Sequence, residues 1–453
     1  MVSKMLGNAD RGAISLCCRA LFVLINANTP FRAVRIKPES KLHLFEHQSM
    51  RRLLLSAVEV RWEIPLNKSS RLWPQNTSST VSGTALTFRN SLCILSQSSN
   101  LSRLYLSDVD VSAPQQETIL SIPKLEHLAL SGSNFIPGAV VKPSYTSLKR
   151  LQLGGRLSSP AIGHTLSLLS ESIEELTLVS VYGKGVDVAI SVSLLLRLKV
   201  LRNLPALGGT GQIAFIRNHP TITHYITAMP HSDFSHLSPA VLPNLDHLRG
   251  NAYAARVFAP GRPVRTYLQD DVSSIASIHA LNPTLVALGR STGPVKRLRL
   301  IYPSETPGLL QLIAITLPQL ESLQLYIGRD DRAGELSNYD YLLGAWCFSP
   351  LPKELGQVQG SARFHKLKDI EIRFARTKQT QDGCHPFPRA QCGYIFDNGL
   401  RDLCPHLQVA EFIAVDPLDK FPEREAEPAY RAKMQRLGPG KWEERKWVNR
   451  ATH

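Results

Sequence analysis

The stretch Leu125-Glu-His-Leu128-Ala-Leu130 is one copy of a phrase, Leu-x-x-Leu-x-Leu, that recurs along the chain. Further clear copies are Leu101-Ser-Arg-Leu104-Tyr-Leu106, Leu148-Lys-Arg-Leu151-Gln-Leu153 and Ile173-Glu-Glu-Leu176-Thr-Leu178. The middle leucines of these four copies are 24, 23 and 25 residues apart. Because side chains alternate between the two faces of a strand, we expect the last two leucines of each copy to share one face of a short strand.

The same spacing continues beyond these four copies. Weaker copies are centred on Leu201, Tyr225 and Leu248. Clear copies return as Val295-Lys-Arg-Leu298-Arg-Leu300, Leu320-Glu-Ser-Leu323-Gln-Leu325 and Leu367-Lys-Asp-Ile370-Glu-Ile372, and a degenerate one is Leu407-Gln-Val-Ala-Glu-Phe412. The stretch from Asn251 to Thr292 fits this register poorly, and Tyr339 to Gly360 is interpreted as an insertion, so we expect loops there.

Apolar residues at helical spacing, such as Leu309, Leu312 and Ile313 after Pro307, lie between the leucine phrases. Each strand and helix would present one apolar face that only stacked neighbours can cover. We therefore predict an α/β fold, an open leucine-rich-repeat solenoid or horseshoe, over residues 84–415. A compact α/β domain is the alternative, but its parallel strands are usually longer and more continuously apolar.

The composition describes a globular and basic protein. Of 453 residues, 43% are hydrophobic and 20% are charged, which is enough to build a large core. The net charge of +15 favours acidic partners. The longest apolar runs are too short to span a bilayer, and Arg19 interrupts the apolar stretch from Ala13 to Ile25. We therefore expect an intracellular protein of the cytoplasm or nucleus, with reduced cysteines and no membrane partner.

The segment Ala13-Ile-Ser-Leu-Cys-Cys-Arg-Ala-Leu21, followed by Thr29-Pro-Phe-Arg-Ala-Val-Arg-Ile36, resembles the second half of an F-box. The phrases Asn218-His-Pro-Thr-Ile-Thr-His224, Leu242-Pro-Asn-Leu-Asp-His-Leu-Arg-Gly250 and Pro294-Val-Lys-Arg-Leu-Arg-Leu300 extend the resemblance to fungal F-box-like leucine-rich-repeat proteins. The resemblance implies a substrate receptor of an SCF-type (cullin-RING) ubiquitin ligase. In such a receptor the F-box holds the small adaptor subunit, which binds the cullin, and the repeats hold the target.

This chain departs from the family pattern at its start, because Met1 to Asp10 contain no Leu-Pro phrase of the kind that opens an F-box. We interpret residues 1–60 as a truncated, helical F-box-like segment with a linker, and residues 416–453 as a charged tail or cap. Trp442 and Trp447 in that tail are expected to cap the last repeat or to form a second contact site.

Sites for catalysis, cofactors and metals are not expected. The glycine-rich stretch Leu207-Gly-Gly-Thr-Gly211 lacks the lysine and hydroxyl residue of a P-loop, so we interpret it as a turn that joins repeats. Cys384-His385, Cys392 and Cys404-x-His406 lack the closely paired spacing of a structural zinc site, so packed thiols are favoured. No nucleophile elbow, zinc-protease or kinase phrase is present.

Residues that flank the middle leucine of each strand should face the concave side of a solenoid, where partners bind. By this rule the predicted partner-binding residues are Arg103, Tyr105, His127, Arg150, Glu175, Arg202, His247, Arg249, Arg297, Arg299, Tyr326, Glu371 and Arg373. Arginine binds a carboxylate or phosphate through two parallel hydrogen bonds, so the expected partner is an acidic or phosphorylated protein. The alternative is that these charges merely solvate an exposed strand face.

Three functional hypotheses follow from the sequence. The first is a non-enzymatic receptor in a ubiquitin ligase, and the second is a leucine-rich-repeat scaffold without ligase association. Direct binding of nucleic acid ranks third, because the charge permits it but no recognition motif supports it.

Overall fold

The computed structural model describes residues 33–36, 48–63, 88–140, 146–182, 185–202, 209–227, 237–270, 278–303, 309–328, 363–375, 400, 403–415, 430–438 and 441–449. The chain divides into two compact units, Met1–Ile222 and Thr223–His453, which we call the N-terminal unit and the C-terminal unit. No helix within the described ranges is both long enough and apolar enough to cross a membrane.

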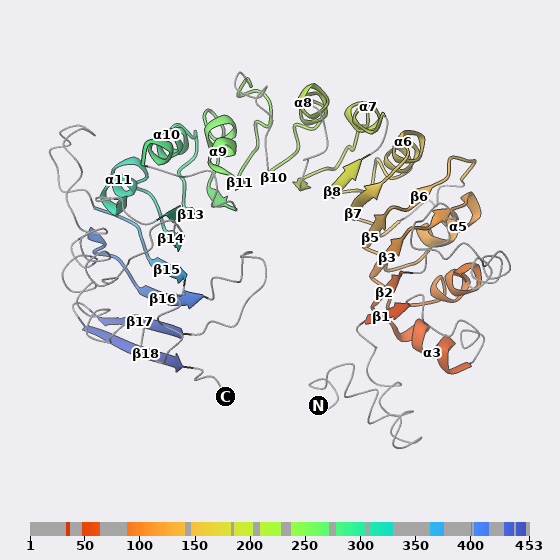
Figure 1. Ribbon diagram of the computed structural model, residues 1–453, viewed down its shortest axis with the longest axis horizontal. Coiled ribbons are helices and arrows are strands. Elements are labelled where there is room, and N and C mark those ends of the chain that lie inside the picture. The colour runs from red at the N-terminus through yellow and green to blue at the C-terminus, as the bar shows by residue number, and fades with distance from the viewer. Residues whose placement is uncertain are drawn as a thin grey trace, which may run out of the picture. The chain divides into compact units, whose positions relative to one another are not determined.

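The N-terminal unit is built on a parallel sheet with helices along one of its faces (Figure 1). In sheet order, its strands are β1 Ala33–Ile36, β2 Glu59–Trp62, β3 Arg103–Ser107, β5 His127–Ser131, β7 Arg150–Arg156, β8 Glu175–Tyr182 and β9 Val200–Arg202. A small second sheet pairs β4 Asp110–Val111 with β6 Asn134–Phe135. The helices are α3 Gln48–Ser56, one over residues 88–95, α5 Ala113–Leu120, α6 Ser159–Leu168, α7 Val186–Ser191 and α8 Gly209–Arg217.

The C-terminal unit repeats this arrangement and ends in an antiparallel hairpin (Figure 1). Its parallel strands are β10 His224–Thr227, β11 His247–Gly250, β12 Thr266–Gln269, β13 Arg297–Pro303, β14 Ser322–Gly328, β15 Asp369–Ala375 and β16 Val409–Val415. The hairpin of β17 Tyr430–Gly438 and β18 Lys441–Asn449 pairs with β16. The helices are α9 Ala252–Phe258, α10 Ile278–Gly289 and α11 Leu309–Thr316.

The middle residues of the leucine phrases lie side by side in successive strands. In the N-terminal unit this row is Val60, Leu104, Leu128, Leu151, Leu176 and Leu201. In the C-terminal unit it is Tyr225, Leu248, Tyr267, Leu298, Leu323, Ile370 and Ala410. All are buried, and burial of one such aliphatic side chain stabilises by about 1.5 to 3 kcal/mol. The predicted α/β fold with a long parallel sheet is therefore confirmed.

Local hydrogen bonds set where the helices begin after the strands. The Ser158 hydroxyl accepts from the Ala161 N–H at 3.3 Å and so caps the start of α6, while Asn251 caps α9 by accepting from Ala254 at 2.9 Å. In the turn after β5, Gly132 has a φ of +61°, and a Cβ there would lie 2.5 Å from the Asp108 carboxylate. This turn therefore requires glycine.

The sheet extends beyond the sequence-predicted repeats in both directions. β1 and β2 lie N-terminal to residue 84, the expected start of the solenoid; β1 pairs in parallel with β2, and β2 pairs in parallel with β3. Residues 1–32, which carry most of the F-box-like stretch, lie outside the described residues. In the region expected to be a charged tail or cap, β17 and β18 form strands, and both Trp442 and Trp447 belong to β18.

Two expectations about the interior of the repeat region need correction or refinement. The stretch from Asn251 to Thr292 is not a loop, because it contains α9, β12 and α10, and β12 pairs on both sides. Tyr267 replaces the middle leucine there, which hid this strand. β14 and β15 are direct neighbours in the sheet, so the 47-residue interval from Leu323 to Ile370, expected to span about two repeats, links two adjacent strands. The insertion at residues 339–360 lies outside the described residues.

Candidate binding face

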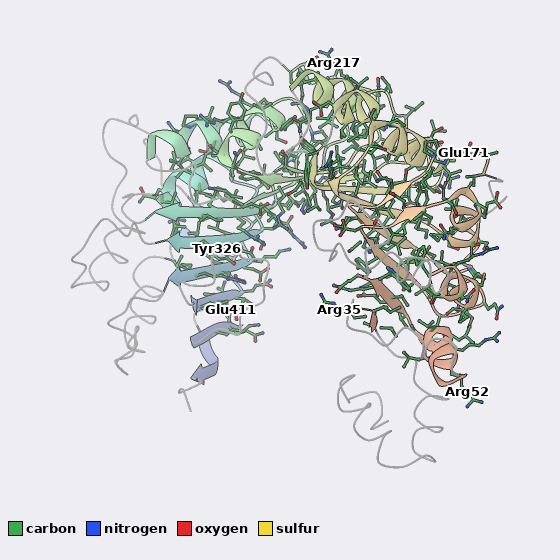
Figure 2. The ribbon with its side chains drawn as sticks, turned by 45° about the vertical axis from the view of Figure 1, so that its right-hand side comes forward. Arg35, Arg52, Glu171, Arg217, Tyr326 and Glu411 are labelled. Carbon is green, nitrogen blue, oxygen red and sulfur yellow. The ribbon has the colours of Figure 1, made fainter. Side chains whose placement is uncertain are left out.

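The face of each sheet opposite the helices, here called the open face, carries all thirteen predicted partner-binding residues. Each lies on a described strand next to a buried residue of that strand, and each is half-buried or exposed. Figure 2 shows Arg35 on the strand side of the N-terminal unit, whereas Arg52 and Glu171 lie on its helix side. The N-terminal members are Arg103, Tyr105, His127, Arg150, Glu175 and Arg202, and the C-terminal members are His247, Arg249, Arg297, Arg299, Tyr326, Glu371 and Arg373.

In the N-terminal unit, Glu59 on β2 is shared by two arginines. The Arg61 Nε donates to Glu59 Oε1 at 2.6 Å, and this hydrogen bond raises the pKa of the Arg61 guanidinium. The Arg103 Nη1 is 3.6 Å from Glu59 Oε2, which is too long for a hydrogen bond. Glu59 therefore holds Arg61 tightly and Arg103 only loosely.

Glu175 on β8 repeats this arrangement further along the sheet. The Arg202 Nε lies 2.7 Å from Glu175 Oε1, and the Arg150 Nε lies 3.4 Å from Glu175 Oε2. Arg103 and Arg150 are more than half exposed, at 53% and 56% of their side-chain surface. Glu59 and Glu175 are only 12% and 19% exposed, but an ion pair with an exposed arginine contributes only about 0 to 1 kcal/mol, so either arginine can exchange its carboxylate for another anion at little cost.

Aromatic side chains fill the space between the two shared carboxylates. The Arg61 guanidinium lies 4.6 Å from the Tyr105 ring centroid, and the Tyr105 and His127 rings meet edge to face at 5.2 Å. Burial raises the pKa of Tyr105. The pKa of His127 is lowered, first by burial and then by the positive charges of Arg103 and Arg150. The open face here is a continuous row of arginine, tyrosine and histidine.

The open face of the C-terminal unit is more buried. The Arg249 Nε donates to both carboxylate oxygens of Asp270, at 2.6 and 2.8 Å, and these side chains are only 20% and 22% exposed. The Arg299 Nε donates to Gln324 Oε1 at 3.1 Å, and burial lowers the pKa of Arg299. These arginines therefore contribute to a packed, hydrogen-bonded surface.

The next strands of the C-terminal unit continue this packed surface. Arg373 forms an ion pair with Glu371 and stacks over the Tyr326 ring at 5.0 Å from its centroid. Burial raises the pKa of Tyr326. Glu411 lies beside Glu371 in the register of β15 and β16 and is buried (Figure 2). From β11 to β16 the open face thus carries Asp270, Glu371 and Glu411 among Arg249, Arg299 and Arg373, together with the exposed Arg297.

The sequence prediction missed several residues of the open face, among them Glu59, Arg61 and Asp270. Glu59 and Arg61 flank Val60 in a strand that precedes the expected repeats, and Asp270 follows the strand centred on Tyr267. The signal for the first strand was present, since Val60 and Trp62 occupy the places of the two leucines, 44 residues before Leu104 and Leu106. The carboxylate partners of Arg103 and Arg249 lie on these missed strands.

Among the residues that the structure describes, no group of three or more histidine, cysteine or carboxylate side chains is placed to hold a metal ion. Cys404 is buried, and burial raises the pKa of its thiol, whereas His406 is exposed. Cys384, His385 and Cys392 lie outside the described residues. The glycine-rich stretch is not simply a turn, because α8 begins at Gly209 and includes its last glycines.

Comparison with known proteins does not assign this face a role. No protein-family model matches the chain, and no curated protein is significantly similar to it.

Proposed function

We propose that this chain is a non-enzymatic protein-interaction module, an open leucine-rich-repeat solenoid whose N-terminal open face binds an acidic or phosphorylated segment of a target protein. The recurring leucine phrase and its alignment in register across each parallel sheet support the solenoid. Solenoids commonly use the strand face for binding, because it offers many side chains in a regular array.

The main support for this proposal is that two exposed arginines are only weakly paired with carboxylates. Arg103 and Arg150 sit 3.6 and 3.4 Å from carboxylates that each have a closer arginine partner. Their guanidinium groups therefore retain donors for a ligand, and Arg with neighbouring Tyr is the composition of interaction hot spots. The target segment would supply the carboxylates or phosphates.

As the cellular setting we propose substrate recognition in a cullin-RING ubiquitin ligase, with the adaptor subunit and cullin as further partners. The resemblance of residues 13–36 to the second half of an F-box supports this setting, and Ala33–Ile36 of that segment forms strand β1. The alternative is a scaffold that binds the same target without a ligase. Nucleic acid fits less well, because Glu59 and Glu175 would lie against a continuous polyanion.

The experiment is co-purification of the tagged full chain from native cells, with the variant Arg103→Glu/Arg150→Glu beside the wild type. A matched control, Arg52→Glu/Arg89→Glu, makes the same charge change at exposed helical positions. We expect the first variant to lose its target proteins and the control to retain them. Retention of every partner by both variants would contradict the binding face.

The same experiment separates the two cellular settings. Recovery of the adaptor and cullin with the wild type and with both variants supports the ligase receptor, because their binding would involve the N-terminal segment and not the open face. Absence of both subunits, with target proteins retained, supports the scaffold.

A further inference from the structure

The two loosely held arginines flank one histidine. Arg103, His127 and Arg150 are direct register partners on the adjacent strands β3, β5 and β7. Neighbouring strands lie about 4.8 Å apart, so Arg103 and Arg150 are separated by roughly 10 Å with His127 between them. An arginine side chain is long enough to turn across one strand, so both guanidinium groups can reach an anion above His127.

The charged groups around His127 form a symmetric pattern. β3 contributes Arg103 and Tyr105, β7 contributes Arg150, and the next strands outward contribute Glu59 and Glu175. The two carboxylates lie at the ends of the row, each held by its own outer arginine on β2 or β9. An anion above the centre would therefore meet cations first, with the carboxylates beyond them.

The net charge of this row matches a doubly charged anion. Arg61, Arg103, Arg150 and Arg202 are opposed by Glu59 and Glu175, which leaves a charge of +2 when His127 is neutral. A phosphate monoester carries nearly two negative charges near pH 7 and accepts several hydrogen bonds. A single carboxylate would neutralise only half of this charge.

We propose that Arg103, His127 and Arg150 form a binding site for a tetrahedral dianion, the phosphate group of a phosphorylated target segment, and that protonation of His127 strengthens binding of this anion. This inference rests on the proposed function and specifies its ligand. Without the anion, the two arginines oppose a positive charge on His127. With the anion in place, that charge gains a direct partner, so proton uptake and anion binding favour one another.

The direct test uses sulfate as the probe, because sulfate keeps its double charge across the pH range in which His127 titrates. Sulfate is titrated into the ¹⁵N-labelled full chain at pH 5.5 and 7.5 at constant ionic strength, and backbone amide signals of β3, β5 and β7 are followed by NMR. We expect about 3- to 10-fold tighter binding at pH 5.5, which corresponds to a coupling of about 0.7 to 1.4 kcal/mol.

Three variants test the location of the anion-binding site. Arg103→Gln/Arg150→Gln should abolish the shifts at both pH values, while His127→Gln should retain binding at pH 7.5 but lose its pH dependence. Arg297→Gln, at an exposed position of the C-terminal open face, should bind sulfate as the wild type does. Equal affinity of the wild type at the two pH values, or shifts that persist in the arginine variant, would overturn the inference.

Phosphatase and nuclease treatment identify the source of the phosphate. Targets that depend on Arg103 and Arg150 in the co-purification should be lost after phosphatase treatment of the lysate and retained after nuclease treatment. Retention of these targets after phosphatase treatment would overturn the proposed phosphate-binding site and leave the proposed binding face intact. Loss after nuclease would overturn the assignment to a protein segment. Sulfate binding at the anion-binding site, without any target protein that depends on Arg103 and Arg150, would instead contradict the proposed function alone.

Discussion

The open faces of the two units share one strand register but hold their arginines differently. In the N-terminal unit, Arg103 and Arg150 are more than half exposed and stand beyond hydrogen-bond distance or close to its limit from carboxylates that already have closer partners. In the C-terminal unit, Arg249 is mostly buried and binds both oxygens of Asp270. Arg103 and Arg150 precede a middle leucine and Arg249 follows one, so arginines on the open face differ in whether they keep spare donors or are neutralised within the sheet.

The difference shows that an arginine beside a middle leucine does not by itself define a binding site. What differs is how closely a carboxylate binds the arginine and how deeply the arginine is buried. A half-buried pair stabilises the sheet, because the loss of one partner leaves a poorly solvated charge. An exposed, shared pair contributes little stability and leaves donors for a partner.

The largest expected effect concerns the core, which we expect to be equivalent in the two units. Leu128→Ala and Leu323→Ala each remove a fully buried middle leucine and should each lower the free energy of unfolding by about 2 to 5 kcal/mol. Urea denaturation measures the loss, and hydrogen exchange shows where protection falls. A difference of several kcal/mol between the two variants would mean that the units differ in their cores as well as in their open faces.

The next effect separates the two open faces. Asp270→Asn should lower the free energy of unfolding by about 1.5 to 3 kcal/mol, because it weakens a half-buried charged hydrogen bond to Arg249. Glu175→Gln should cost less than about 1 kcal/mol, because Glu175 is itself only 19% exposed but its partners Arg150 and Arg202 are 56% and 41% exposed and can turn to solvent. Equal losses in urea denaturation would remove the distinction between the two surfaces.

The third effect is a pH dependence of the folding stability, which arises from a buried histidine in the core of the N-terminal unit and not from its open face. His219 is buried, its Nδ1 lies 2.6 Å from the Phe215 carbonyl oxygen, and its Nε2 accepts from the Leu195 N–H. Burial lowers the pKa of His219 in the folded chain, so the unfolded chain binds the proton more readily. Stability should therefore fall as pH drops below about 6.5, by up to about 1.4 kcal/mol per pH unit.

Thermal unfolding of His219→Gln between pH 7.5 and 5.5 measures this contribution. The variant should lose part of the acid sensitivity, whereas His127→Gln should change the pH dependence of anion binding more than that of stability. An unchanged acid slope in His219→Gln would show that this histidine is not held neutral.

The smallest effect concerns an exposed ion pair within the C-terminal unit. The Arg265 Nε lies 3.5 Å from the Asp246 carboxylate, and the two side chains are 60% and 43% exposed. Arg265→Ala should change the free energy of unfolding by less than about 0.5 kcal/mol, with no difference left in 1 M salt. A loss as large as that of Asp270→Asn would mean that exposure does not govern these pairs.

The leucine phrase predicted the strands and their register well, because a buried row requires similar residues at a constant interval. It failed at Tyr267, where an aromatic ring fills the leucine position and the intervals change to 19 and 31 residues. The thirteen predicted residues all lie on described strands, since strand alternation fixes which positions are buried, while their role in partner binding stays a prediction. Their pairing was beyond prediction, because Glu59 and Arg103 are 44 residues apart and meet only through the register of β2 and β3.

The proposed function requires that the N-terminal open face, and not the C-terminal one, binds the partner. Gln152 and Gln324 occupy equivalent positions, each following a middle leucine, and both are half-buried. A photo-crosslinking amino acid at either position in the full chain, irradiated in native cells, tests the claim directly. We predict crosslinks to target proteins from position 152 that disappear in Arg103→Glu/Arg150→Glu, and none from position 324. Crosslinks to the same targets from position 324 alone would contradict the claim.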